Sequence, residues 1–141
     1  MRLLLVLLLF MFGSTAEELS LELTTTAQRQ GCIRIAVYAT EAGYAAGESV
    51  SARVVKLDRL TTDFSVALKG LAPGEYVVAA YHDVNENGKL DKSLLGMPKE
   101  PYGFAREPLN KWSRPTWDEI AIEYGVDVNR LKIDLKTWKE R

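Results

Sequence analysis

The feature that most constrains the fold of this chain is a series of short segments in which apolar and polar residues alternate. Alternation with a period of two is typical of β-strands that bury one face, and no apolar repeat of 3.6 residues is long enough to predict a sizeable helix. Together with the turn residues between them, these segments predict an all-β fold, a single seven-stranded β-sandwich of immunoglobulin-like or transthyretin-like type. The predicted strands are residues 18–23, 32–38, 50–57, 63–68, 76–81, 118–124 and 129–135.

The first two predicted strands are separated by a polar segment, residues 24–31, and are interpreted as a hairpin. Pro73-Gly74 has the residues of a type II turn, with proline second and glycine third. The strand at 76–81 is almost continuously apolar, which indicates that both of its faces are covered. Residues 41–48, rich in glycine and alanine, are expected to form a loop, and a short helical turn over 117–120 is compatible with a cap from Ser113 or Thr116.

One long segment, residues 83–116, has neither a strand nor a helix pattern. Loops longer than about 12–15 residues are uncommon in compact domains and are usually functional or disordered. Order is favoured here because several apolar side chains are available for burial, and the domain 17–141 is therefore predicted to carry one long ordered loop. The apolar residues expected to be buried are Leu90, Leu94, Leu95, Met97, Tyr102, Phe104 and Trp112.

The start of this loop has the spacing of a calcium-binding loop of the EF-hand type. Oxygen-bearing side chains occupy the places of ligands 1, 3, 5 and 9, and Gly88 stands at the sharp turn. Calcium takes six to eight oxygen ligands, so a tight loop of alternating inward side chains suits it. The predicted metal ligands are the side chains of Asp83, Asn85, Asn87 and Asp91 and the backbone carbonyl of Lys89.

The match to an EF-hand is incomplete. Leu94 stands at position 12, where a bidentate glutamate belongs, and the flanking segments are not helical. Glu100 or a water molecule is the candidate for the missing ligand. The alternative is a polar turn in which Asp and Asn side chains accept hydrogen bonds from their own backbone, without a metal.

The N-terminus has the pattern of a secretory signal peptide. Arg2 is followed by an apolar run from Leu3 to Phe12 and by the small residues Ser14-Thr15-Ala16, so cleavage is expected after residue 16. Ten apolar residues are too few for a membrane span, which needs about 20. The mature protein is therefore expected to be exported, to the periplasm or beyond the cell, without a membrane span.

Charge and cysteine content exclude two other classes. Without Arg2 the chain carries 17 basic and 19 acidic residues and no long basic run, which argues against a nucleic acid partner. Cys32 is the single cysteine, so an intrachain disulfide is excluded. Because it lies within an apolar segment, Cys32 is expected to be a buried small hydrophobic residue.

Two stretches, His82 to Asp91 and Gly96 to Phe104, resemble the signature of a bacterial exported family known as domain of unknown function 2141. The family pattern is H-D-x-N-x-N-G-x-L-D followed by G-x-P-x-E-P-x-G-F-S, and the chain departs from it at Ala105. The resemblance implies an exported β-sandwich of unassigned activity. The step Leu71-x-Pro73-Gly74-x-Tyr76 is also similar to that of transthyretin-like and carboxypeptidase-regulatory-like sandwiches, which supports only the fold.

His82, the only histidine, is the one candidate for a general base. An enzyme would use it with Asp83 or Glu100, whereas the alternative is that His82 hydrogen-bonds to the loop backbone. The sequence contains no G-x-S-x-G or H-E-x-x-H motif, and one histidine with one cysteine is too few for a zinc site. We therefore assign no catalytic residue.

Binding is the leading hypothesis. Tyr102 and Phe104 pair aromatic rings with a rigid backbone, and they are candidate ligand-binding residues together with His82 and Glu100. Three basic residues could hold an anion or form a solvated loop face: Arg106, Lys111 and Arg114. Trp112, Trp117 and Trp138 are expected to serve packing.

The expected function is that of an exported non-enzymatic protein with a calcium-ordered loop that presents a binding surface. Its partner is expected to be an envelope protein, a polysaccharide or a small ligand. The alternatives are a small envelope enzyme using His82 and a purely structural module in which the loop only plugs one end of the sandwich.

Overall fold

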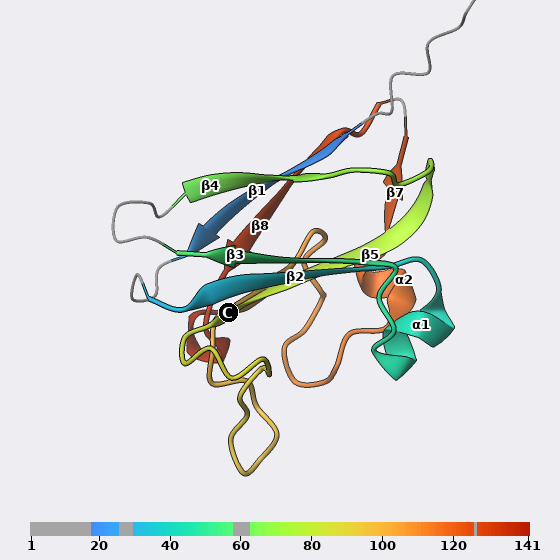
Figure 1. Ribbon diagram of the computed structural model, residues 1–141. Helices are drawn as coiled ribbons and strands as arrows, with labels where there is room; N and C mark the ends of the chain where they lie inside the picture. The colour runs from blue at the N-terminus through green and yellow to red at the C-terminus, as the bar shows by residue number, and fades with distance from the viewer. Residues whose placement is uncertain (1–17, 26–29, 58–62, 126) are drawn as a thin grey trace, which may run out of the picture.

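The computed structural model describes residues 18–25, 30–57, 63–125 and 127–141 (Figure 1). The proposed signal peptide, residues 1–16, lies outside the described residues. The described part is mostly β, with one sheet in the order β4-β1-β8 and a second in the order β3-β2-β5-β6, in which β7 also pairs with β5. The strands are β1 (Leu19–Thr25), β2 (Cys32–Tyr38), β3 (Ser51–Lys56), β4 (Asp63–Leu68), β5 (Gly74–Asp83), β6 (Tyr102–Phe104), β7 (Ile122–Tyr124) and β8 (Arg130–Leu135).

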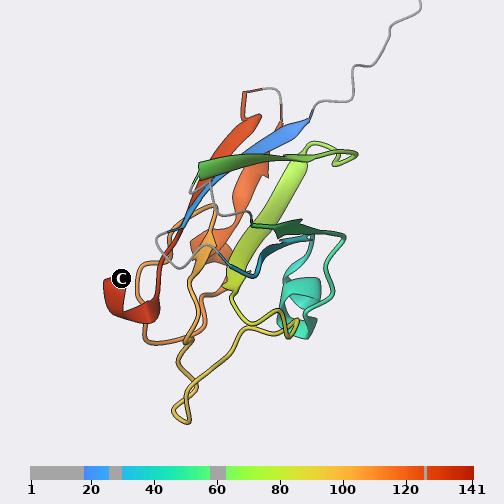
Figure 2. The same cartoon turned by 60° about the vertical axis from the view of Figure 1, so that its left-hand side comes forward.

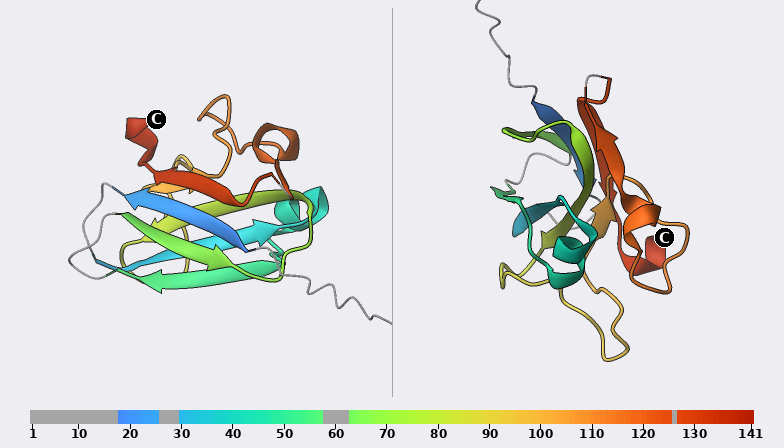
Figure 3. Two further views of the ribbon diagram at one scale, coloured as in Figure 1. Left: turned by 90° about the horizontal axis from the view of Figure 1, so that it is seen from above. Right: turned by 90° about the vertical axis from the view of Figure 1, so that its right-hand side faces the viewer.

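The two sheets form two layers, which Figures 2 and 3 show from three further directions. Apolar residues that alternate along the strands meet between the layers in one buried cluster, as the sequence pattern predicts. The inward positions of β2 and β4 are those expected from the alternation. The cluster includes Leu19, Leu21 and Leu23 of β1, Ile33, Ile35 and Val37 of β2, Val78 and Ala80 of β5, and Ile133 and Leu135 of β8.

The predicted hairpin between the first two strands is wrong. β1 pairs with β4 and, in parallel, with β8, whereas β2 pairs with β3 and β5 in the other sheet. Both strands are amphipathic, and each buries its apolar face against the opposite layer instead of lying beside the other. Of the intervening segment predicted as a turn, residues 26–29 lie outside the described residues.

The structure has eight strands in its described part, not the seven predicted. β6 (Tyr102–Phe104) lies inside the segment predicted to be a loop. Gly103 permits it, because a Cβ at this position would lie 2.7 Å from Cγ2 of Ile133 and 2.8 Å from the carbonyl oxygen of Asp134. β6 therefore approaches β8 closely, and Tyr102 and Lys136 exchange backbone hydrogen bonds of 3.0 and 3.2 Å that link the two sheets.

The segment predicted as one strand at 118–124 is divided. Its first part belongs to helix α2 (Trp117–Ile120) and its second part is β7. The Thr116-x-x-Glu119 sequence forms a capping box, in which the Glu119 carboxylate accepts the backbone N–H of Thr116 at 2.8 Å. This local signal outweighs the alternation and confirms the helical turn that the sequence allowed, with Thr116 as the cap.

Two further local predictions are wrong. Residues 41–46, expected in a loop, form helix α1 (Glu41–Ala46), which Thr40 caps by accepting the N–H of Gly43 at 3.0 Å. The type II turn expected at Pro73-Gly74 would need a positive φ at Gly74, whereas Gly74 begins β5 and the positive φ of 77° falls on Gly70.

β5 is covered on both faces only near Val77, so the prediction from its continuous apolar character holds for part of the strand. Val78 and Ala80 face the shared core, and Val77 faces the other way into a second buried cluster with Tyr44 of α1 and Trp117 of α2. Beyond Val77 the same outer face of the sheet is covered by neither helix, and this open part is the floor of the groove described below.

The segment from 84 to 101 projects beyond the sheets (Figure 1). Leu94 is fully exposed and Leu95 is 84% exposed, and Trp112 in the next connection is 78% exposed. The predicted burial of these three residues is therefore wrong, because neither sheet covers the segments that carry them. No helix in the described ranges is both long enough and apolar enough to cross a membrane.

Candidate functional site

The loop with the calcium-like spacing begins at Asp83, the last residue of β5. Its buried carboxylate accepts the backbone N–H of Asn87 on Oδ1 at 3.0 Å and that of Gly88 on Oδ2 at 2.8 Å. Oδ2 also accepts the Nε–H of Arg34, from the neighbouring strand β2, at 2.7 Å. Gly88 makes the turn with a φ of 81°, as its place in the motif predicts.

This arrangement perturbs the carboxyl group of Asp83. Burial by itself would raise the pKa of Asp83, but the hydrogen bond from Arg34 and those from the N–H groups of Gly88 and Asn87 outweigh burial and lower the pKa. Asp83 therefore acts as a charged acceptor that organises the backbone of its own loop.

The other oxygen-bearing side chains also bond within the loop. The Asp91 carboxylate accepts Nδ2–H groups of Asn85 and Asn87 at 2.8 and 2.9 Å. The side-chain oxygen of Asn85 accepts the N–H of Asn87 at 3.2 Å, and that of Asn87 accepts the N–H of Lys89 at 2.9 Å. These are the contacts of a polar turn that stabilises its own backbone, and the calcium site stays a prediction beside them.

Glu100 closes the base of this loop. Its carboxylate is buried and accepts the N–H of Val84 at 2.9 Å and the N–H of Asp91 at 3.0 Å, so it joins the two ends of the turn. Asn85, Asp91 and Glu100 line one side of a hollow of about 380 Å³. In the described part of the chain, no three His, Cys, Asp or Glu side chains are grouped as metal ligands.

His82 lies under the loop and not in an open pocket. It is fully buried, with Nδ1 3.3 Å from the hydroxyl of Thr25 and Nε2 2.6 Å from the carbonyl oxygen of Gln30. In the described residues His82 makes no hydrogen bond to Asp83 or Glu100. The geometry favours a structural role for His82, in which it ties β5 to the segment before β2.

Cys32 is buried, as the sequence predicts, with its thiol 4.0 Å from Oδ2 of Asp83. Burial is the main cause that raises the pKa of the Cys32 thiol. The thiol is thus held in its neutral form.

A groove lies on the outer face of the sheet β3-β2-β5-β6. It consists of two adjoining hollows of about 550 and 430 Å³, each of a size typical of ligand pockets. We call them the loop hollow and the sheet hollow; the loop hollow lies between residues 90–98 and 111–115, and the sheet hollow crosses the four strands. They share the lining residues Tyr38, Ala79, Leu90, Tyr102 and Phe104.

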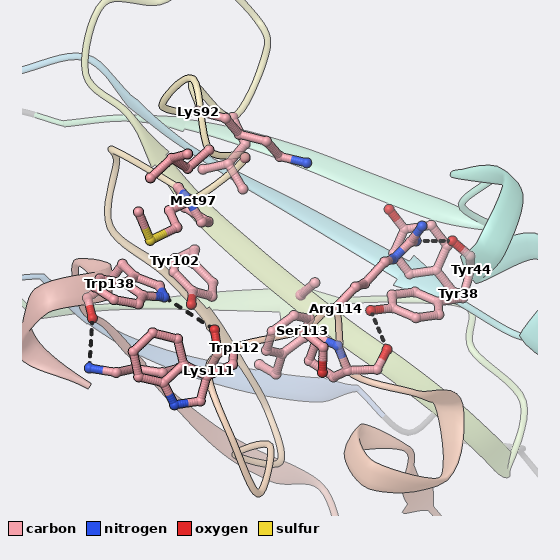
Figure 4. Close-up of a pocket in the computed structure, with 17 residues that line it drawn as sticks. Tyr38, Tyr44, Lys92, Met97, Tyr102, Lys111, Trp112, Ser113, Arg114 and Trp138 are labelled. Atoms are coloured by element: carbon pink, nitrogen blue, oxygen red, sulfur yellow. Dashed lines mark hydrogen bonds between the residues drawn. The ribbon is translucent and has the colours of Figure 1, made fainter.

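Aromatic rings and basic side chains together line the loop hollow (Figure 4). The ammonium group of Lys111 lies 4.4 Å from the ring centre of Trp138, and the guanidinium of Arg114 lies 4.4 Å from that of Tyr44. The rings of Tyr102 and Phe104 meet edge to face with centres 6.3 Å apart. Figure 4 also shows Lys92 approaching the hollow from the opposite loop.

The charge of the groove is one-sided. Among the described residues that line either hollow, five are basic and none is Asp or Glu, although the chain has 19 acidic residues against 18 basic ones. Arg34 is paired with Asp83, but no ion pair with an acidic side chain is formed within the described residues by the remaining four. The basic residues are Arg34, Arg53, Lys92, Lys111 and Arg114.

The structure thus divides the candidate residues predicted from the sequence. Tyr102 and Phe104 lie in the groove, whereas His82 and Glu100 support the loop beneath it. Lys111 and Arg114 line the loop hollow, but Arg106 instead donates to the carbonyl oxygens of Asp118 and Ala121 at 3.4 and 3.3 Å.

The sequence reasoning did not single out several lining residues, among them Tyr38 and Lys92, and it expected Trp138 only to serve packing. Tyr38 follows the core residue Val37 of β2, so the alternation places its ring on the outward face of the strand. An aromatic ring on that face could have been recognised from the sequence as a candidate binding residue. No local sequence pattern predicts a binding role for Lys92, because that role depends on its loop lying across the hollow from residues 111–115.

Two sheets around one core, with an aromatic and basic groove beside a loop rich in Asp and Asn, define an all-β protein with a candidate ligand-binding face. The chain belongs to the family of domain of unknown function 2141, described as uncharacterized proteins conserved in bacteria, whose model matches residues 21–132. The family assignment made from the loop signature is confirmed. No curated protein and no solved structure matches the chain significantly.

Proposed function

We propose that this chain is an exported, non-enzymatic β-sandwich protein whose ordered loop presents a groove for an anionic ligand. The shared core between the sheets supports the sandwich class, and the immunoglobulin-like or transthyretin-like arrangement is part of the proposal. Export rests on the signal-peptide pattern of residues 1–16 and on the resemblance that the sequence carries.

The observation that carries the proposal is the lining of the groove. A concave surface whose described lining combines several aromatic rings with basic groups and contains no Asp or Glu attracts a ligand that has both apolar surface and negative charge. Non-enzymatic binding is favoured over catalysis because His82 is buried and engaged by Thr25 and Gln30, so it does not face this groove.

Calcium has a defined place in the proposal. The ion would bind the oxygens of Asp83, Asn85, Asn87 and Asp91 and the carbonyl of Lys89, and would fix the loop that forms one wall of the groove. Support comes from their spacing, from the positive φ of Gly88 and from the convergence of both Asn side chains on Asp91. Glu100, beside Asp91, is the candidate for a further ligand.

A pair of fluorescent probes tests the groove: 8-anilinonaphthalene-1-sulfonate and N-phenyl-1-naphthylamine, which share their aromatic rings and differ in the sulfonate. We expect the sulfonate to bind about tenfold more tightly, as a hydrogen bond to a charged group gives, with energy transfer from tryptophan. Trp112→Ala should weaken binding, whereas Leu109→Ala, which truncates an 89% exposed side chain of the same connection, should not.

Equal binding of the two probes, or no binding of either, would contradict the proposal. A groove that fails to bind the sulfonate leaves the purely structural alternative, in which the loop only covers one end of the sandwich. Circular dichroism of each variant establishes that a lost signal reflects the groove and not unfolding.

A further inference from the structure

The chemistry of the groove also indicates which kind of anion it accepts. The sheet hollow is lined from all four strands, β3, β2, β5 and β6, so at the usual strand spacing of about 4.8 Å it extends for about 14 Å before the loop hollow continues it. A groove of this length, open to solvent, suits a segment of a linear chain better than one compact small molecule.

The floor of the groove is a sheet face and not a sheet edge. Ala36 of β2 and Ala79 of β5 are directly paired within it, and their backbone groups belong to the ladder between these strands. A bound peptide strand would need free backbone donors and acceptors at an edge. The floor offers small side chains and aromatic rings instead, on which the apolar C–H face of a hydroxyl-bearing ring can pack.

Three tyrosine hydroxyl groups are available along this floor. Tyr38, Tyr81 and Tyr102 line the sheet hollow, and within the described residues none of their hydroxyls has a hydrogen-bond partner. Partial burial is the main cause that raises the pKa of each of these tyrosines, so their hydroxyls remain protonated donors. They can donate to and accept from the hydroxyl groups of a ligand.

Two basic residues, Lys92 and Arg114, line the loop hollow that continues the groove. Lys92 has no contact in the described structure that would engage its ammonium group, and Arg114 spends its hydrogen bonds on the carbonyl oxygens of Tyr44 and Ala45. The ammonium charge of Lys92 is therefore available to a negatively charged group on a ligand. The guanidinium of Arg114 contacts neutral carbonyl oxygens and the ring of Tyr44, so no acidic side chain of the described residues neutralises its charge.

We infer that the groove binds a segment of an acidic polysaccharide. Sugar rings would stack on Tyr38, Tyr102 and the exposed Trp112, and the acidic groups would meet Lys92 and Arg114. This inference rests on the proposed function and names the ligand class for that same groove.

Calorimetric titration of the full chain with oligogalacturonate and with alginate oligosaccharides tests the inference, with a malto-oligosaccharide of equal length as the neutral comparison. We expect at least one acidic oligosaccharide to bind at least tenfold more tightly than the neutral one. The affinity should fall as sodium chloride is raised, because exposed charges are screened.

Matched variants localise the binding. Lys92→Glu should weaken the acidic oligosaccharide at least tenfold, while Lys69→Glu makes the same change of charge at an exposed residue that does not line the groove and should have little effect. Trp112→Ala should weaken binding, and Leu109→Ala should not. All four positions are exposed, so these variants retain the core.

Poly-aspartate and vesicles of phosphatidylglycerol distinguish the other polyanions. If either binds as tightly as the acidic oligosaccharides with the same sensitivity to Lys92→Glu, the polysaccharide inference is overturned in favour of an acidic peptide or a lipid surface. Absence of binding by both acidic oligosaccharides, with the naphthalene sulfonate still bound, overturns this inference and leaves the proposed function intact. Loss of both signals overturns both.

Discussion

Glu100→Gln is the most informative single change in the loop, because it preserves the size of a buried side chain and alters only its hydrogen bonding. The wild-type carboxylate accepts two backbone N–H groups, those of Val84 and Asp91, at 2.9 and 3.0 Å. A carboxamide offers one oxygen, so one of these N–H groups would face an NH₂ donor. The two ends of the turn would then lose one of their two attachments to Glu100.

The expected cost in stability follows from burial, because the Glu100 carboxylate is buried and the two residues that donate to it, Val84 and Asp91, are half-buried. A donor left without a partner costs about 1–3 kcal/mol, and the remaining bond loses its charge assistance, so the loop should be destabilised by about 2–4 kcal/mol. For a urea slope of about 2 kcal/mol/M, this is a decrease of about 1–2 M in the unfolding midpoint if the loop unfolds with the sheets.

Urea unfolding followed by circular dichroism measures the global effect, and hydrogen exchange of the Val84 and Asp91 amides measures local opening. If the loop opens separately, exchange at these amides should accelerate by about 30-fold or more while the midpoint changes little. Glu123→Gln is the control, since this exposed carboxylate on β7 forms no hydrogen bond in the described part of the chain. Unchanged exchange together with an unchanged midpoint would refute the assigned role of Glu100.

Two further predictions concern charge in the same loop. Because the pKa of Asp83 is lowered in the folded protein, its contribution to stability is complete above its unfolded pKa of about 3.9 and is lost as the pH falls through the folded pKa. Between pH 6 and pH 2, the free energy of unfolding should therefore fall more steeply for the wild type than for Asp83→Asn. Parallel curves for the two proteins would contradict this. Calcium at about 10 mM, with a dissociation constant of about 10⁻⁴–10⁻³ M, should stabilise the protein by about 1.5–3 kcal/mol and raise its melting temperature by several degrees. Asp91→Asn should abolish the rise, and the absence of any rise in the wild type would remove calcium from the proposal. Asp83→Ala should abolish it too, but is a weaker test, because Asp83 also bonds to Arg34 and to its own loop without a metal.

Elements whose stabilisation is local could be predicted from the sequence. Alternation located the strands whose faces meet the core, and the place of Gly88 in the motif specified a turn that only a positive φ allows. The buried state of Cys32 followed from its apolar neighbours. Where two local signals competed, as at 117–124, the capping box of Thr116 and Glu119 outweighed alternation and produced a helix before the strand.

The pairing between strands could not be predicted from the sequence pattern. An alternating pattern says that β1 and β2 each have an apolar face, but both a hairpin and two opposed layers bury that face equally well. In the structure the two strands lie in opposed layers, and β8, which is distant in sequence, pairs with β1. β6 is too short to show a period, and it depends on a glycine that lets it approach β8.

The same distinction between local and long-range interactions applies to the candidate site. By itself the amino-acid sequence determined the family, the loop with its spaced oxygens and the presence of Tyr102 and Phe104. Only the tertiary structure decided that the loop and the segment 111–115 enclose a groove with Tyr38, and that acidic residues are absent from its described lining. The reason is physical: hydrogen bonds within a turn join residues close in sequence, whereas a concave surface is formed by segments that the packing of two sheets brings together.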